Sequence, residues 1–391
     1  MKRFLIAVAL LLIAGEAPAQ FNGCSAGFCA PVVSGGGSCT INSVSLGGNT
    51  FTGGASSGTV VGAITVSTSG TCGTDTLSVT GTNASDFQIS GTNLETNGVV
   101  AGGSYSINIV ATISGATGSP FTQAEVICGA GSHAATFIAR TSGMSNTETT
   151  AYCNLINGLD TDSTYALFDA LYIFATNTTT TADLNLVSTN FTLTSHGSCT
   201  FTADHGYTGD GSSCYLDTGL DPQSCTGVTC NFANTTAMHG VYVLTNSTST
   251  PGAPEIDIGA VNDSTVFNYI LPIFTDGKSY CSINSTSNNG PVTVGNTDGS
   301  WMCVGNSTNS VFYRNGSSIG SGTASAGAVP NVNYYILARN DSGSGGGSSP
   351  AEFSPHQLSA AWIGQMPNST QAANIQSRIN TFMTSQGINT Y

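Results

Sequence analysis

The sequence is poor in charged residues, and most of those it has are acidic. Asp, Glu, Lys and Arg make up only 7% of the 391 residues, and seven Lys and Arg against 21 Asp and Glu give a net charge of −14. Nucleic-acid binding and binding to anionic membranes both need a basic surface, so both classes are excluded. Coiled coils and long surface helices with ion pairs are excluded because Lys, Arg and Glu are scarce.

Hydrophobic runs long enough to cross a membrane are also missing. The apolar run at residues 4–14 is too short, because a transmembrane helix needs about 20 residues. Lys2 and Arg3 precede this run and small residues follow it at 17–19, which predicts a signal peptide over residues 1–19. We therefore expect an exported protein, secreted or held at a cell surface or in a virion.

The sequence contains no Cys-x-x-Cys pair, and its five His are scattered, so a zinc site is not indicated. All 12 Cys follow the predicted cleavage site, and an even number in an exported chain predicts disulfides. Connectivity stays open, because 12 Cys allow on the order of ten thousand pairings. The local candidates are Cys24–Cys29, Cys225–Cys230 and Cys281–Cys303.

Glycine is abundant, with 49 residues, and short β-like runs separated by turn residues dominate the chain. After a Cys- and Gly-rich arm at 20–39, residues 40–128 alternate with period two, which predicts a small antiparallel sandwich. Residues 129–158 are expected to connect the domains through one short helix, and 163–175 to continue with a second.

About ten further β-like runs within residues 159–391 predict a two-sheet jelly roll. They are expected at 191–193, 215–217, 240–244, 255–259, 266–271, 279–283, 300–304, 311–314, 333–338 and 358–363. A terminal helix capped by Asn368 or Ser369 follows. The fold class is therefore all-β, with short peripheral helices.

Two family resemblances refine this organisation. Residues 58–62, 85–89, 94–96 and 105–112 resemble a cadherin-like repeat, an Ig-like sandwich, although the acidic clusters with which such repeats bind calcium are missing. Residues 130–391 resemble the LamG-like, concanavalin A-like jelly rolls of secreted bacterial and tailed-phage proteins. That second resemblance is carried by segments 201–211, 215–219, 312–316 and 335–340 and by Ile363-Gly364.

Catalysis is not indicated. Retaining laminarinase-type glycosidases on this fold use a strand reading Glu-x-Asp-x-(x)-Glu, in which two carboxyl groups flank the bond to be cleaved. Glu255 and Asp257 match that pattern, but Gly259 or Ala260 stands at the third carboxylate. The Gly- and Ser-rich segment 343–347 lacks the strand–helix frame and the Lys of a phosphate-binding loop.

A binding site is the better hypothesis. Sugar-binding sites on such sandwiches combine aromatic faces with Asn and Asp, in some cases around calcium. Asp204, Asp210, Asp217 and Asp221 lie close in sequence beside Tyr207 and Tyr215. The set predicts either a ligand or calcium loop or, alternatively, ordinary Asp-Gly turns with tyrosines on the sheet edge. Trp301 and Trp362 lie in apolar runs and are expected in the core.

The sequence thus predicts an exported, non-enzymatic adhesion or recognition protein. Its jelly roll is expected to contact carbohydrate or a surface protein, and no nucleic acid. The alternative is a structural component of a virion or cell envelope, and a glycoside hydrolase ranks behind both. Ligand and oligomeric state stay open.

Overall fold

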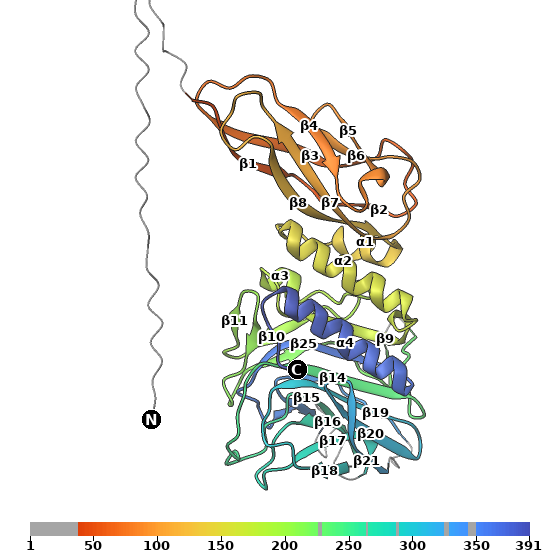
Figure 1. The fold of residues 1–391 in the computed structure, drawn as a ribbon. Helices are drawn as coiled ribbons and strands as arrows, with labels where there is room; N and C mark the ends of the chain where they lie inside the picture. The colour runs from red at the N-terminus through yellow and green to blue at the C-terminus, as the bar shows by residue number, and fades with distance from the viewer. Residues whose placement is uncertain (1–37, 226–228, 263–264, 287–288, 324–327, 343–348) are drawn as a thin grey trace, which may run out of the picture.

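The computed structural model describes residues 38–225, 229–262, 265–286, 289–323, 328–342 and 349–391. Within them the protein is all-β, with two sandwiches and four α-helices (Figure 1). The predicted signal peptide, the Cys24–Cys29 pair and the segment 343–347 lie outside the described residues. None of the described helices is both long enough and apolar enough to cross a membrane.

The first sandwich packs the sheet β1-β3-β6-β5 on the sheet β2-β8-β7-β4. Alternation sets its core, because Ile107 and Ile109 of β7 are buried whereas Ser106 is exposed. The strands are β1 (Thr40–Leu46), β2 (Thr50–Thr52), β3 (Val60–Ser69), β4 (Thr76–Thr80), β5 (Phe87–Ser90), β6 (Asn93–Thr96), β7 (Gly103–Thr112) and β8 (Phe121–Ala130).

A helical layer follows, formed by α1 (Ser132–Ile138), α2 (Asn146–Thr161) and the C-terminal α4 (Ser369–Ser385). Ser145 caps α2, and Asn368 caps α4 in a capping box with Gln371. The short helix expected within residues 129–158 is α2, and it continues three residues past Gly158. Gly158 serves close helix packing instead, since a Cβ there would lie 2.8 Å from Cδ of Arg378 on α4.

The larger sandwich has two sheets. The inner sheet has the order β11-β12-β25-β14-β19-β20-β21, with β9 beside β25, and the outer sheet has the order β10-β13-β22-β15-β16-β17-β18, with β23 and β24 attached. The inner strands are β9 (Phe168–Ile173), β11 (Thr200–Thr202), β12 (Gly206–Thr208), β14 (Ala237–Val243), β19 (Gly299–Gly305), β20 (Asn309–Arg314), β21 (Ser317–Thr323) and β25 (Gln357–Gly364). The outer strands are β10 (Thr194–His196), β13 (Tyr215–Asp217), β15 (Ile258–Asn262), β16 (Val266–Leu271), β17 (Ser279–Ser285), β18 (Asn289–Val292), β22 (Tyr335–Ile336), β23 (Arg339–Asp341) and β24 (Ser349–Ala351).

The inner sheet is covered on both faces. On β14, Met238 and Tyr242 pack with the helical layer, whereas Val241 and Val243 pack with the outer sheet. Figure 1 shows α4 beside β14 and β25, and α2 next to α4 on its other side. The helices therefore form a third layer over the inner sheet, while the outer face of the outer sheet is not covered by the described helices.

The predicted helix at 163–175 is wrong. The segment is a short 3₁₀ turn (Tyr165–Leu167) and then β9, whose six residues are all buried. Since β9 pairs with β25 in a sheet covered on both faces, its residues are buried on both sides, Asp169 included, and the alternation of buried and exposed residues that marks a half-buried strand is absent.

Three strand predictions are corrected by the backbone. The strand expected at 191–193 begins at Thr194, because Phe191 has φ 61°. The strand expected at 333–338 shortens to β22, because the backbone turns at Leu337 with φ 66°. Glu255 and Asp257 precede β15, which begins at Ile258. The runs at 215–217 and 266–271 are strands with the expected limits.

Five disulfides hold these parts: Cys39–Cys72, Cys128–Cys153, Cys199–Cys214, Cys225–Cys230 and Cys281–Cys303. The last two are local pairs that the sequence suggests. The pair Cys128–Cys153 links β8 of the first sandwich to α2. It therefore fixes the small sandwich to the helical layer covalently.

Candidate ligand-binding site

The predicted acidic loop is built from carboxylates that hold turns. Asp210 Oδ1 accepts the backbone N–H groups of Ser212, Ser213 and Cys214 at 2.9, 2.7 and 2.9 Å. Together with the Ser213 hydroxyl, these donors hold the pKa of Asp210 far below its usual range. This carboxylate shapes the turn between β12 and β13.

The other three aspartates are also engaged in turns. Asp217 accepts from the Gly219 amide at 2.8 Å, and Asp221 accepts from the Gln223 amide at 2.9 Å. Asp204 has φ 61° in the tight turn between β11 and β12. In the part of the chain that the structure describes, no three His, Cys, Asp or Glu side chains gather to hold a metal ion.

The two predicted tyrosines lie on opposite sheets. Tyr207 of β12 is buried in the inner sheet, and its hydroxyl donates to Asp183 Oδ1 at 2.8 Å. Tyr215 of β13 is half-buried on the outer sheet, where it stacks between His196 and Tyr335 with ring centroids 4.6 and 4.4 Å away. Tyr215 thus belongs to the face left uncovered by helices, and Tyr207 to the core.

An aromatic pocket of about 240 Å³ lies on that outer face. It is built by β16 and β17 and by the β23–β24 hairpin. On β16, Ile270 packs inward while Phe267, Tyr269 and Leu271 belong to a separate outer cluster. Tyr280 stands opposite Leu271 on β17. The pocket is lined by Pro254, Ile256, Phe267, Tyr269, Leu271, Phe274, Tyr280, Arg339 and Glu352.

The aromatic rings of the pocket contact one another edge to face. Phe267 and Tyr269 have centroids 6.3 Å apart at 80°, and Phe274 and Tyr280 have centroids 5.5 Å apart at 82°. Perpendicular packing fixes the position of each ring. The half-buried Phe267, Phe274 and Tyr280 therefore form firm apolar walls that a ligand can reach.

One cation with two carboxylates forms the polar part of the pocket. Arg339 Nη1 lies 3.0 Å from Glu352 Oε2, and Arg339 Nη2 lies 3.0 Å from Asp341 Oδ2. Burial raises the pKa of Glu352, and Arg339 opposes that rise. The buried Nε of Arg339 has no hydrogen-bond partner. A fixed guanidinium and carboxylate beside aromatic walls can hold a ligand with both hydroxyl groups and an apolar face.

Glu255 and Asp257 lie on either side of His356. Both carboxylates contact one imidazole: His356 Nδ1 lies 2.8 Å from Asp257 Oδ1, and Nε2 lies 3.6 Å from Glu255 Oε2. Asp257 is fully buried and also accepts from the Ser354 hydroxyl at 2.6 Å. A buried carboxylate cannot reach a substrate.

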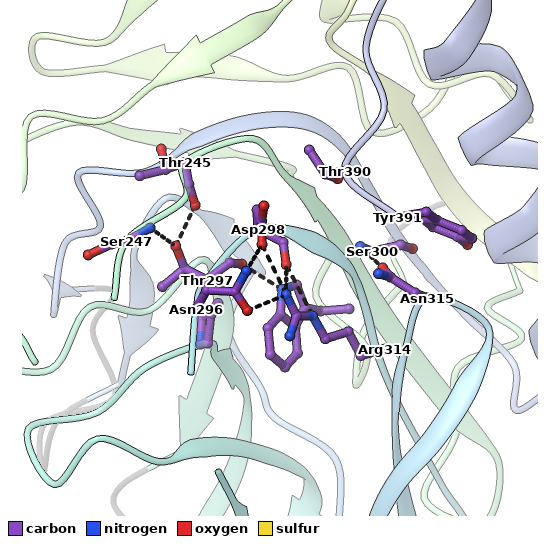
Figure 2. Close-up of polar contacts among 12 residues, drawn as sticks. Thr245, Ser247, Asn296, Thr297, Asp298, Ser300, Arg314, Asn315, Thr390 and Tyr391 are labelled. Atoms are coloured by element: carbon purple, nitrogen blue, oxygen red, sulfur yellow. Dashed lines mark hydrogen bonds and ion pairs between the residues drawn. The ribbon is translucent and has the colours of Figure 1, made fainter. Parts of the chain in front are cut away.

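Both tryptophans are fully buried, as the sequence predicts. The Arg314 guanidinium lies 4.8 Å from the Trp301 ring centroid. Figure 2 shows Arg314 directed at Asn296 and Asp298, to which its Nη2 donates at 2.8 Å (Asn296 Oδ1) and 3.0 Å (Asp298 Oδ1). This network holds the loop before β19 and leaves neither tryptophan free for a sugar.

Sequence reasoning missed the pocket residues. The run at 266–271 carries a signal, since Phe267 and Tyr269 share one face of the strand while Val266, Asn268 and Ile270 share the other. No local signal marks Arg339 and Glu352, because the β23–β24 pairing joins them across 13 positions of the chain.

Comparisons with known proteins find similar structures but no family. No protein-family profile and no curated protein sequence matches the chain. One similar structure is domain 4 of an extracellular arabinanase from Geobacillus stearothermophilus in complex with arabinotriose, with TM-score 0.35 and 13% identity over 54% of this chain and 98% of that chain. A Trypanosoma rangeli sialidase mutant has TM-score 0.35 and 9% identity over 74% and 46%. The botulinum neurotoxin serotype C1 binding domain has TM-score 0.32 and 11% identity over 54% and 52%.

Proposed function

We propose that this chain is an exported, non-enzymatic recognition protein that binds glycan in the aromatic pocket of its larger sandwich. The observation that carries the proposal is the juxtaposition of Phe267, Phe274 and Tyr280 with the Arg339–Glu352 ion pair. Aromatic faces pack against the C–H face of a sugar ring, and a charged fork binds its hydroxyls. Disulfides support export, because they persist in oxidising compartments.

A non-enzymatic role is supported by the way in which the carboxylates are engaged. Glycoside hydrolysis needs two carboxyl groups that flank the scissile bond. Glu255 and Asp257 are both directed at His356, and Glu352 is paired with Arg339. Each of these carboxylates has a partner within the protein, which suits binding without turnover.

The test is a glycan array with residues 20–391, with calcium and with a chelator. The affinity for each glycan that binds on the array is then measured by calorimetry for the unchanged protein, for Phe274→Ala and for Tyr280→Ala. We expect calcium-independent binding that each variant weakens about tenfold, because each removes part of an aromatic wall. The comparison variant is Tyr215→Ala, on the same sheet but outside the pocket, and it should bind normally.

Three outcomes would count against the proposal. If a well-folded sample binds no glycan, the proposal of glycan recognition is wrong. Loss of binding in Tyr215→Ala alone moves the site to the His196–Tyr215–Tyr335 stack. Release of a reducing sugar from a bound glycan, abolished by Glu255→Gln, would show a hydrolase.

A further inference from the structure

A second cleft lies between the small sandwich and the helical layer. Its volume is about 540 Å³, more than twice that of the aromatic pocket. Its walls are β1, the loop that follows it, β8, α2 and the last residue of α4. It is lined by Val44, Ser45, Leu46, Asn49, Gln123, Ala124, Glu125, Val126, Asn146, Thr147, Thr150, Ala151, Asn154 and Ser385. Interfaces between packed units are common places for small-molecule sites.

The walls of the cleft are held rigidly. Asn49 Nδ2 donates to the carbonyl oxygens of Val126 and Asn146 at 3.1 and 2.9 Å and also contacts the Thr150 hydroxyl. Asn146 Nδ2 in turn donates to the Leu46 carbonyl at 2.8 Å. The Cys128–Cys153 disulfide closes the same junction. A ligand would therefore meet a preformed site, and the entropic cost of binding would be low.

Two acceptors in the cleft lack a partner. Asn49 is only 4% exposed, and its Oδ1 has no hydrogen bond. The amide orientation is set by the three oxygen atoms around Nδ2, so the unpaired atom is an acceptor. Glu125 is half-buried and forms no ion pair within the described residues. Asn49 Oδ1 is closed to solvent, so Glu125 is the acceptor that a ligand can reach, and a carboxylate without an ion-pair partner among the described residues favours a ligand that brings a positive charge.

The lining defines the class of ligand. Glu125 is the charged side chain in the lining, and the other polar groups are hydroxyls and amides. A cationic donor is therefore preferred over an anion. The N-terminal turn of α2 carries a partial positive charge, which would favour an anion. Glu148 is buried in that turn and Ser145 caps it, so both already satisfy the helix end and the preference for a cation stands. Hydroxyls and amides on several sides match a ligand rich in hydroxyl groups.

We propose that this cleft is a second ligand site, which binds a glycan through an unacetylated amino sugar. The ammonium group would pair with Glu125, and neighbouring hydroxyls would exchange hydrogen bonds with Thr147 and Asn154. The site is independent of the aromatic pocket, because the two share no lining residue.

The experiment is calorimetry on residues 20–391 with glucosamine tetramer, N-acetylglucosamine tetramer and a neutral glucose tetramer. We expect the amine form to bind at least tenfold tighter than the other two. Glu125→Gln should remove that preference. Thr147→Trp, at an exposed position of α2, should block all binding in the cleft. Circular dichroism and the unfolding midpoint confirm that both variants fold.

Tyr280→Ala separates this proposal from the proposed function. It should leave glucosamine binding unchanged even if it abolishes binding of other glycans. Burial raises the pKa of Glu125, so binding should weaken as the pH falls through that pKa and the carboxylate is protonated.

The proposal is overturned if no glucosamine binding occurs, if Glu125→Gln binds as well as the unchanged protein, or if Tyr280→Ala abolishes glucosamine binding. Equal binding of a lysine-rich peptide, also lost in Glu125→Gln, would overturn the assignment to a sugar.

Discussion

His356 Nδ1 lies 2.8 Å from Asp257 Oδ1, with both side chains almost completely buried. Glu255 approaches the other ring nitrogen from a more exposed position. The two carboxylates that suggest a glycosidase in sequence are thus joined through one imidazole. A buried charge of this kind is tolerated only when it is paired and hydrogen-bonded.

The first prediction concerns pH. Burial lowers the pKa of His356, but Asp257 and Glu255 outweigh burial and raise the pKa overall. A histidine with a raised folded-state pKa contributes stability that is full below its unfolded pKa, about 6.5, and is lost as the pH rises through the folded value. The unfolding midpoint of the unchanged protein should therefore fall as the pH rises from about 6.5 through the folded-state pKa of His356. The unfolding midpoint of His356→Gln should fall less over the same pH range.

The same variant isolates the buried pair. Removing His356 leaves Asp257 without its charge partner, which should cost about 3–5 kcal/mol near neutral pH. Denaturant titrations from pH 5 to pH 9 would measure both effects. Parallel pH profiles for the two proteins would contradict the role assigned to the imidazole.

The second prediction concerns the link between β8 and α2. The Cys128–Cys153 bond closes a loop with sequence separation 25. Replacing both cysteines with Ala should cost about 3 kcal/mol, because the unfolded chain gains freedom. Protease sensitivity near residue 131 should rise. The comparison variant, Cys199→Ala with Cys214→Ala, should leave cleavage there unchanged, and equal cleavage in both double variants would refute the expectation.

The third prediction concerns a close approach of two strands. Gly240 of β14 pairs with Trp362 of β25, and a Cβ at Gly240 would lie 2.2 Å from the indole ring. Gly240→Ala should therefore cost about 1–3 kcal/mol through overpacking. Chemical denaturation followed by tryptophan fluorescence checks it. Gly252→Ala, where no neighbour lies within 4 Å, is the matched control, and equal effects at both sites would contradict the packing argument.

The fourth prediction concerns Arg314. Its side chain donates to Asn296 Oδ1 and Asp298 Oδ1 while its guanidinium lies over Trp301. Lys lacks the planar fork that makes these contacts together, so Arg314→Lys should cost about 1–2 kcal/mol. Arg378→Lys, at a more exposed ion pair with Asp162, should cost less than about 1 kcal/mol. The order of the two unfolding midpoints measures the difference, and the reverse order would disprove it.

Local chemistry in the sequence determined much of the fold. β-like runs located strands such as Val266–Leu271, and a capping residue, Asn368 or Ser369, located the start of α4. Apolar context placed Trp301 and Trp362 in the core. These signals are short-range, because they depend on strand and helix periods and on a few neighbouring residues.

Tertiary structure decided what depends on distant neighbours. β9 reads like a helix until its pairing with β25 buries both of its faces. The sequence predicts Asp210 as a ligand-binding residue, but in the structure its carboxylate accepts hydrogen bonds from three backbone amides of the following turn. The aromatic pocket and the cleft beside Glu125 are each assembled from segments far apart in the chain. Only the packing of sheets and helices sets those contacts, so sequence alone determined many of the elements, whereas the tertiary structure decided β9 and both sites.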